Sequence, residues 1–294
     1  MKFGAIFPSC EIGSDPSVIR DWAQAAEALG FSHIITYDHV LGAEHSGRPS
    51  PLLTPYTEKT PFHEPFVLLA YLAGVTSTIE FVTVVLVLPQ RQTALVAKQA
   101  AELALLSNGR FRLGLGTGSN PVEYESLGAS FADRGHMLDE QVQVLRKLWG
   151  ASVIDYTGDF HRIDRAGILP RPASSIPLWF GGRSAAAIRR AAEVGDRFLF
   201  SPANDAIKAF CVQLTEALDA NGRRDGFGID VFTGFGDGPD HWQREIEAWG
   251  ALGANSLSVR TQTIGSVLLG EKDPGFTKPQ QHVDALESFM REVR

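Results

Sequence analysis

The chain has 294 residues, of which 44% are hydrophobic and 21% are charged, the balance of a soluble globular protein. Its 27 lysines and arginines against 34 acidic residues give a net charge of −7, which argues against nucleic acid or an anionic membrane as the main partner. Two cysteines are too few for a disulfide scaffold, and the longest apolar run, residues 81–88, is too short to cross a bilayer. The first ten residues lack the apolar stretch of a signal peptide. We therefore expect a cytoplasmic protein that acts on a small molecule.

The first half of the chain alternates between predicted strands and helices. An apolar strand over residues 2–7 precedes a helix that starts at Asp15-Pro16, where the aspartate offers an N-cap oxygen and the proline suits the first turn. A second strand over 33–40 leads into a loop over 41–61 rich in Gly, Ser and Pro, and a loop of that length usually has a function. The remaining elements are a helix at 65–75, a strand at 79–88, a helix at 94–106 and a strand at 110–116.

The second half continues this alternation after one interruption. A helix over 131–149 is followed by a predicted hairpin over 152–164 that turns at residues 157–159. The later strands are predicted at 177–180, 197–201, 229–235 and 255–259, and the later helices at 184–194, 205–220, 239–252 and 279–292. Eight strands that alternate with helices predict one domain over 1–294, a (β/α)8 TIM barrel with an insertion between strands four and five. An open, doubly wound sheet is the alternative.

Asp38 and His39 are the first candidates for chemistry, because catalytic residues of such barrels follow the carboxyl ends of the strands. A histidine can exchange a proton near neutral pH, although a hydrogen-bonded structural role is the alternative for His39. Cys10 follows the first strand and could line the same pocket, or it could be an inert core thiol.

Glycines follow the fourth predicted strand, where Gly116 and Gly118 precede Ser119. The run resembles a dinucleotide-binding fingerprint, but Ser119 stands where the fingerprint requires glycine, so we reject a Rossmann site. Glycines at a strand end instead allow a planar ligand or a neighbouring backbone to approach closely.

Gly181, Gly182, Arg183 and Ser184 lie between the fifth predicted strand and a helix. Free N–H groups at the helix start, a hydroxyl and a guanidinium there could bind a phosphate, and later strands of these barrels often carry a phosphate site. The alternative is a tight turn in which Ser184 caps the helix.

Several ordered segments resemble the luciferase-like monooxygenase superfamily, and more narrowly its branch that uses the deazaflavin coenzyme F420. The segments are FGAIFP, AEALGFSHIITYDHV, VTVVLVLPQR, AKQAAELALLSNGRFRLGLGTG, RGHMLDEQVQVLRKLW and PLWFGGRS, and the resemblance is strong over residues 1–201. It implies a barrel that binds coenzyme F420, or alternatively FMN, at its carboxyl-terminal mouth. We expect a homodimer that transfers hydride to or from a small organic substrate.

The resemblance also implies roles for individual residues. Asp38 and His39 match a pair of the F420-using branch, in which the histidine faces the reactive part of the ring. His39 is then the proton donor, and Asp38 fixes its orientation. A non-proline cis peptide under the ring is expected near Val84-Val85.

The same resemblance places the phosphate at Gly181 and Gly182, followed by Arg183 and Ser184. Arg91 or Arg183 is then the candidate for contact with the acidic tail of coenzyme F420.

One position departs from the family pattern. Relatives in the F420 branch carry a glutamate after the strand-four glycines, whereas this chain has Ser119, beside the cofactor-site candidates Gly116 and Gly118. A hydroxyl cannot take over acid–base work near pH 7, so the substrate is expected to differ. If FMN is the cofactor, the expected activity is that of a monooxygenase using reduced flavin and oxygen. A non-catalytic flavin-binding barrel is the third reading.

Overall fold

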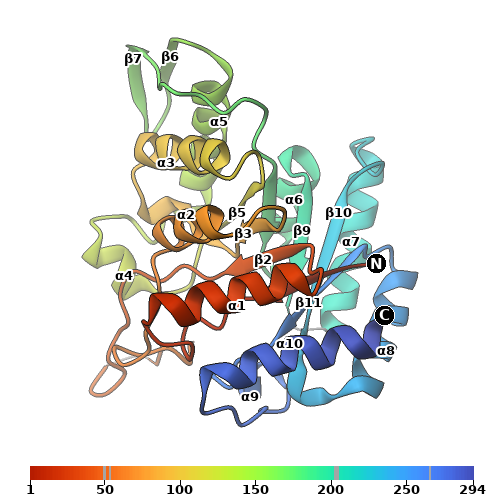
Figure 1. Cartoon of the computed structure of the whole chain (residues 1–294). Coiled ribbons are helices and arrows are strands. Elements are labelled where there is room, and N and C mark those ends of the chain that lie inside the picture. Colours follow the sequence, from red (N-terminus) through yellow and green to blue (C-terminus); the bar gives the residue numbers. More distant parts are fainter. Residues whose placement is uncertain (49–50, 53, 202–204, 265) are drawn as a thin grey trace.

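Parallel strands close into a barrel in the computed structural model, which describes residues 1–48, 51–52, 54–201, 205–264 and 266–294 (Figure 1). The strands of the wall are β1 (Lys2–Ile6), β2 (His33–Thr36), β3 (Glu80–Thr83) with β4 (Leu86–Val87), β5 (Phe111–Gly116), β8 (Leu178–Gly181), β9 (Arg197–Phe200), β10 (Gly228–Gly234) and β11 (Ser256–Arg260). β3 and β4 share the third position on either side of a cis peptide at Val84-Val85, and β3 pairs with β5 to close the ring. The predicted (β/α)8 barrel is confirmed, and so is the predicted place of the cis peptide.

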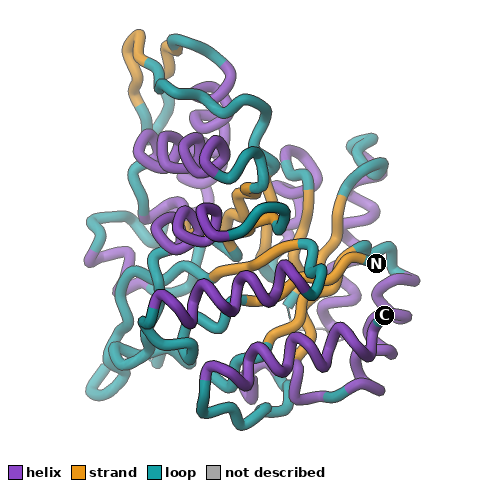
Figure 2. The backbone as a smooth tube through the Cα atoms, viewed as in Figure 1, coloured by secondary structure: helices purple, strands orange, loops and turns teal. Residues whose placement is uncertain are grey.

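Helices surround the barrel and cover the outer face of its strands (Figures 1 and 2). They are α1 (Pro16–Ala28), α2 (Pro65–Val75), α3 (Thr93–Leu106), α5 (Arg134–Gly150), α6 (Ala185–Val194), α7 (Asp205–Ala220), α8 (Pro239–Ala251) and α10 (Pro279–Val293). α1 begins as predicted, because the Asp15 carboxylate accepts a hydrogen bond from the Ser17 N–H at 2.8 Å. Within the described residues, no helix is long and apolar enough to cross a membrane.

Short elements at the strand ends were not predicted from the sequence. They are the helices α4 (Pro121–Ser126) and α9 (Ser266–Leu269) and the 3-10 turns η1 (Leu88–Gln90) and η2 (Phe235–Asp237). α4 has six residues, α9 has four, and η1 and η2 have three each, so none is long enough to show a hydrophobic period. α4 follows β5, α9 follows β11, η1 follows β4 and η2 follows β10, so these short elements shape the mouth of the barrel.

The predicted hairpin is present as β6 (Ile154–Thr157) and β7 (Arg162–Ala166), an antiparallel pair that lies beyond α3 and α5 (Figure 1). The Glu140 carboxylate of α5 accepts hydrogen bonds from the backbone N–H groups of Asp159, Phe160 and His161 at 2.7–3.0 Å. The Glu140 carboxylate therefore helps to fix the insertion between strands four and five to the barrel, together with the Thr93 hydroxyl, which lies 2.6 Å from His161 Nε2.

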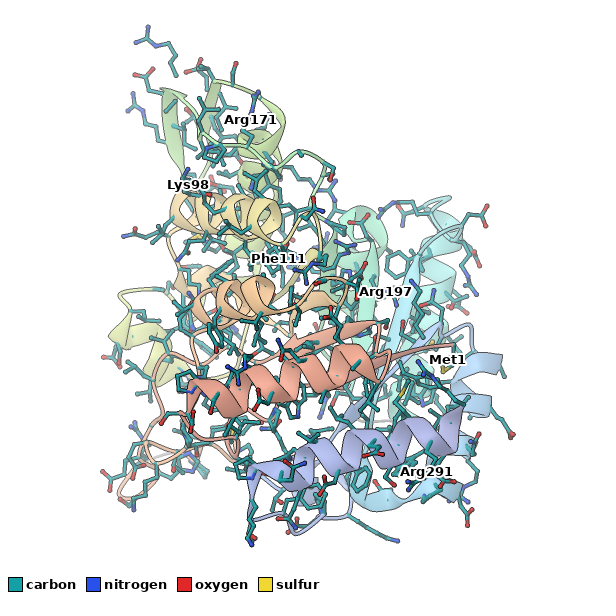
Figure 3. All side chains as sticks on the ribbon, in the orientation of Figure 1. Met1, Lys98, Phe111, Arg171, Arg197 and Arg291 are labelled. Atoms are coloured by element: carbon teal, nitrogen blue, oxygen red, sulfur yellow. The ribbon has the colours of Figure 1, made fainter. Side chains whose placement is uncertain are left out.

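Buried side chains fill the barrel interior as well as the layer between helices and strands. Figure 3 shows all described side chains on the ribbon. The interior cluster consists of buried residues on six different strands: Ile6, Ile35, Val82, Trp179, Leu199 and Phe232. Tyr37 and Val84 pack on its upper side, toward the carboxyl ends of the strands. The barrel is thus closed by a hydrophobic plug, and the residues above this plug form the floor of the mouth.

Candidate active site

Asp38 leaves the end of β2 and contacts the bulged third strand. Its buried carboxylate accepts hydrogen bonds from the Val87 N–H at 2.9 Å and from the Arg91 guanidinium at 2.6 Å. Burial raises the pKa of Asp38, and the guanidinium of Arg91 opposes that rise. Arg91 also contacts Glu64 at 3.1 Å. β2 ends at Thr36, earlier than predicted, because the chain turns here so that Asp38 can hold the strand next to it.

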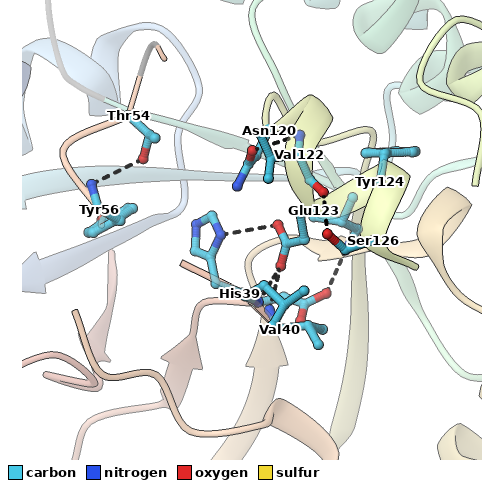
Figure 4. A network of polar contacts seen from close by, with 12 residues as sticks. His39, Val40, Thr54, Tyr56, Asn120, Val122, Glu123, Tyr124 and Ser126 are labelled. Atoms are coloured by element: carbon cyan, nitrogen blue, oxygen red, sulfur yellow. Dashed lines mark hydrogen bonds and ion pairs between the residues drawn. The ribbon is translucent and has the colours of Figure 1, made fainter. Parts of the chain in front are cut away.

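His39 turns away from Asp38 and lies in an aromatic enclosure. Its ring centroid is 5.2 Å from that of Tyr56 and 4.7 Å from that of Phe62, both from the long loop after β2. The side chain remains 23% exposed, and its Nδ1 lies 3.4 Å from the Glu123 carboxylate (Figure 4). The expectation that Asp38 orients His39 therefore needs correction, since the carboxylate against the ring belongs to Glu123.

Glu123 is the site residue that the sequence reasoning missed. It sits on α4, whose Asn120 accepts a hydrogen bond from the Val122 N–H at 3.1 Å and so caps the helix. Its Oε1 accepts hydrogen bonds from the backbone N–H groups of Val40 and, at 3.2 Å, Leu41. Burial alone would raise the pKa of Glu123, but His39 and these two N–H groups outweigh burial and hold the pKa below its usual range.

A signal for this helix existed in the sequence. Asn120 is followed by Pro121, and Glu123 stands three residues after the cap, which is the spacing of a capping box. The pattern would have placed a glutamate near the end of β5. It would not have revealed that the carboxylate reaches the loop after β2 instead of its own helix cap.

The glycines of β5 admit the neighbouring strand. A Cβ on Gly114 would lie 1.8 Å from the Thr83 carbonyl oxygen, and a Cβ on Gly116 would lie 2.2 Å from the Val85 side chain. Gly118 has φ +58° and would meet the Val87 side chain at 2.7 Å. Of the two interpretations given to this run, close approach of neighbouring protein atoms is the one observed. Ser119, by contrast, is exposed beside them.

The end of β8 lies against the same bulge. A Cβ on Gly181 would lie 3.0 Å from Val85 Cγ1, so the Val85 side chain sits between Gly116 and Gly181. Val84 and Val85 are themselves partly exposed. Four of the predicted cofactor-binding residues are therefore brought together around the cis peptide.

The turn from β8 into α6 has the features of both interpretations given to it. Gly182 has φ +143°, and the Ser184 hydroxyl accepts a hydrogen bond from the Ala187 N–H at 3.2 Å, which makes it the helix cap. Arg183 is exposed, and its Nε donates to the Ser201 carbonyl at 3.1 Å. A helix start has several N–H groups without a partner inside the helix, and the Ser184 hydroxyl accepts a hydrogen bond from only one of those of α6.

Tyr37, Arg260 and Glu271 form a buried polar cluster at the β2 and β11 side of the mouth. Burial raises the pKa of Tyr37 to about 12, and Arg260 forms an ion pair with Glu271. Burial likewise raises the pKa of the Cys10 thiol to about 12, so the thiol is protonated at neutral pH. Cys10 fits the inert alternative.

The described residues contain no group of three or more His, Cys, Asp or Glu side chains that could hold a metal ion. The site chemistry consists instead of one partly exposed imidazole, a glycine-lined floor around Val85 and a helix start that carries Arg183. These features suit a planar organic ring with an anionic extension: the floor is apolar and partly exposed at Val84 and Val85, and the α6 start offers N–H groups and a cation.

Comparison with known proteins identifies the family of the chain. The sequence profile of the luciferase-like monooxygenase family matches residues 1–282. The chain is 38% identical over 191 residues to an uncharacterized protein of Mycobacterium tuberculosis, which covers 63% of this chain and 66% of that protein. It is 29% identical over 187 residues to the F420-dependent glucose-6-phosphate dehydrogenase of Nakamurella multipartita, covering 63% of this chain and 52% of that one.

A solved structure agrees over the whole length. The crystal structure of monooxygenase RslO1 from Streptomyces bottropensis matches with a TM-score of 0.80 at 19% identity, covering 100% of this chain and 98% of that chain. At that identity the likeness supports the fold alone. The profile match over nearly the entire sequence, with the closed barrel, shows that the chain belongs to the luciferase-like monooxygenase family, whose members are oxidoreductases and monooxygenases.

Proposed function

We propose that the protein is a coenzyme F420-dependent oxidoreductase that transfers hydride to or from a small organic substrate, with His39 as the residue that exchanges the proton. The observation that carries the proposal is the setting of His39. Its imidazole is partly exposed at the mouth, enclosed by Tyr56 and Phe62, and held against the buried carboxylate of Glu123.

The floor of the mouth fits the ring of such a cofactor. Val84 and Val85 present a partly exposed apolar surface, and the glycines at 116 and 181 make room for the Val85 side chain between them. When bound, coenzyme F420 supplies the ring carbon that gives or accepts the hydride. Asp38 holds the floor in place through the Val87 N–H and Arg91, which makes it a structural support of the site rather than a proton carrier.

The phosphate and the acidic tail are assigned to the turn into α6. Gly182, Arg183 and Ser184 stand at the helix start, where N–H groups and the helix dipole favour an anion. Of the two arginines considered for the tail, Arg91 is occupied by Asp38 and Glu64, whereas Arg183 is exposed. We therefore assign the tail to Arg183.

His39 would act as the proton carrier for the substrate. Tyr56 and Phe62 shield its ring from bulk water, which strengthens electrostatic interactions at the ring and limits proton loss to solvent. Ser119 has no proton to exchange near pH 7 and would at most hold the substrate by a hydrogen bond.

An FMN-dependent monooxygenase is the second candidate, because monooxygenases as well as F420-dependent enzymes are found among the relatives of this chain. Titration of the purified protein with F420 and with FMN, followed by fluorescence quenching, separates the two. We expect at least tenfold tighter binding of F420. A tenfold preference for FMN would overturn the assignment, and binding without turnover on enones, nitro compounds and alcohols would favour a non-catalytic flavin-binding barrel.

We also propose that the protein is a homodimer. Helices α2 and α3 expose apolar side chains on the outside of the barrel, with Val67 70% exposed and Leu95 52% exposed. Apolar patches on a helix surface commonly mark an interface. Analytical ultracentrifugation should give twice the 32.0 kDa mass of the chain, and Val67→Glu with Leu95→Glu should halve it. A monomeric native protein would contradict this proposal.

A further inference from the structure

Glu123 divides its two carboxylate oxygens between two tasks. Oε1 accepts the backbone N–H groups of Val40 and Leu41, and Oε2 faces Nδ1 of His39 at 3.4 Å (Figure 4). The side chain is only 2% exposed, and its pKa is held below the usual range, so it is a carboxylate at neutral pH. A carboxylate can only accept hydrogen bonds. A proton on the ring nitrogen that faces Oε2 is therefore favoured over a lone pair there.

We infer that Glu123 is the positioning residue of His39 and that it fixes the neutral imidazole as the Nδ1–H tautomer. The proton of the neutral ring is held between Nδ1 and the carboxylate, and the lone pair of Nε2 is left on the opposite side of the ring. In a neutral histidine, the groups that contact the two ring nitrogens determine which nitrogen carries the proton. Among the described residues, the only carboxylate in contact with the His39 ring is that of Glu123, and it faces Nδ1.

This tautomer determines the direction in which His39 can work. Neutral His39 accepts a proton at Nε2, and protonated His39 returns it from the same atom. This part of the inference rests on the proposed function. In the oxidation of an alcohol, the Nε2 lone pair would take the O–H proton as the C=O double bond forms, and bound F420 in its oxidised form would supply the acceptor for the hydride that leaves the C–H carbon. Reduction of a carbonyl reverses each of these movements.

The substitution Glu123→Gln separates the two tasks with almost no change in size. The two backbone N–H groups of Val40 and Leu41 require an acceptor, so the amide oxygen takes the place of Oε1. The amide NH2 group then faces His39 and can only donate, which requires a lone pair on Nδ1. The neutral ring must change to the Nε2–H tautomer, and Nε2 can no longer accept a proton.

Glu125 provides a matched control on the same helix. It lies two residues further along α4 and is exposed, whereas Glu123 is buried. Glu125→Gln removes the same charge from the same six-residue helix without touching the ring of His39. Any effect of Glu123→Gln that is caused by lost charge alone should therefore also occur in Glu125→Gln.

The tautomer is measured by long-range ¹H–¹⁵N correlation NMR of protein labelled in histidine, without cofactor or substrate. The chain has eight histidines, and the His39 signal is assigned by its absence in His39→Asn. Over a pH series, we expect the neutral ring to be Nδ1–H in the native protein and in Glu125→Gln, and Nε2–H in Glu123→Gln. A neutral Nε2–H ring in the native protein would overturn the inference, even if the variant failed to fold.

A second measurement uses turnover with F420 and a substrate found by screening. Glu123→Gln should lower kcat for alcohol oxidation by roughly 10²-fold to 10⁴-fold, the range in which general acid–base catalysis contributes, with a much smaller change in KM. Glu125→Gln should be within twofold of the native protein. A changed tautomer with unchanged kcat would show that Nε2 does not carry the proton. Absence of all F420 turnover in native protein would contradict the proposed function and leave the NMR result standing.

Discussion

The two ends of the barrel interior both contain buried polar side chains, but they satisfy them differently. At the amino-terminal end, His33 Nε2 lies 3.0 Å from Asp230 and 3.1 Å from the Ser258 hydroxyl, and that hydroxyl donates to Asp230 at 2.9 Å. Ser32 completes the set, with its hydroxyl 2.8 Å from His33 Nδ1. Every polar atom of the His33 ring therefore has a partner within the protein.

The carboxyl-terminal end keeps polar groups without partners. Within the described part of the chain, both amide atoms of Gln90, Nε of Arg260 and Oε1 of Glu271 are buried and form no hydrogen bond. Leaving a buried polar group unpaired costs about 1–3 kcal/mol, so such groups are uncommon in native proteins. At the amino-terminal end, Asp230 Oδ2 also forms no hydrogen bond, but it lies 3.0 Å from His33 Nε2. The contrast is therefore one of degree: the polar groups of the amino-terminal cluster face one another, while the mouth leaves more of them unpaired near the proposed chemistry.

The largest expected effect is on turnover, from a change at the mouth. His39→Ala removes the proton carrier and should lower kcat by roughly 10²-fold to 10⁴-fold, while affinity for the cofactor changes much less. Steady-state kinetics and cofactor titration on the same preparation provide the two quantities. His136→Ala, on the exposed side of α5, is the control and should match the native protein. If cofactor affinity collapses while turnover per bound cofactor is normal, His39 is a binding residue.

The next effect is on stability, from a change at the opposite end. Asp230→Ala leaves His33 and Ser258 without their buried acceptor and should lower the free energy of unfolding by about 3–4 kcal/mol, with normal turnover per folded molecule. Urea unfolding measures the first quantity. Asp225→Ala, on an exposed turn nearby, should change stability by less than about 0.5 kcal/mol. Loss of turnover at unchanged stability would mean that the two ends are not divided as described.

The difference between the ends also explains what the sequence could predict. The strands and helices followed from local signals, such as apolar runs ended by Gly or Pro and the Asp15 cap, so the barrel and the hairpin at 152–164 were expected within a few residues. The place of the cis peptide came from family resemblance. Local patterns contain no information on partners that are far apart in the chain.

The site depends on such distant partners. Glu123 contacts His39 and Val40 across more than 80 residues of sequence, and Asp38 contacts Arg91 across 53. Asp38 and His39 were predicted to act as a pair because they match such a pair in the F420-using branch of the family. The fold separates them, since successive side chains at the end of a strand point in different directions. Their roles became distinguishable only when their partners were known.

A third effect concerns cofactor affinity at the turn into α6. Gly182 has φ +143°, a conformation that side chains rarely adopt, and Gly182→Val should weaken cofactor binding by on the order of 2–3 kcal/mol because it blocks approach to the helix start. Gly182→Ala is the smaller version for the case in which valine disturbs the turn. Gly226→Ala is the control, because Gly226 has φ +78° in open space. Unchanged affinity in a folded Gly182 variant would place the phosphate elsewhere.

The smallest effect is a pH dependence of stability that comes from the rim of the mouth. His282 on α10 is 1% exposed, and its Nδ1 lies 2.9 Å from the Thr261 hydroxyl. Burial outweighs a hydrogen bond to the Thr261 backbone, which acts in the opposite direction, and lowers the pKa of His282 from 6.5 to about 4. The Glu11 carboxylate lies 3.6 Å from Nε2. Between pH 6.5 and about pH 4, His282 is therefore protonated in the unfolded chain and neutral in the folded chain. Stability from this residue is present above pH 6.5 and is lost as the pH falls toward 4.

The expected loss between pH 7 and pH 5 is about 2 kcal/mol, since one pKa unit corresponds to about 1.4 kcal/mol. Glu11 and Glu271, whose pKa values burial raises, act in the opposite direction, so the pH dependence of the whole protein does not report His282 alone. The informative quantity is the difference in pH slope between native protein and His282→Gln, from urea unfolding at several pH values. The variant should lose stability less steeply as the pH falls. Equal slopes would contradict this prediction, because they would mean that His282 takes up its proton at the same pH in the folded and in the unfolded chain.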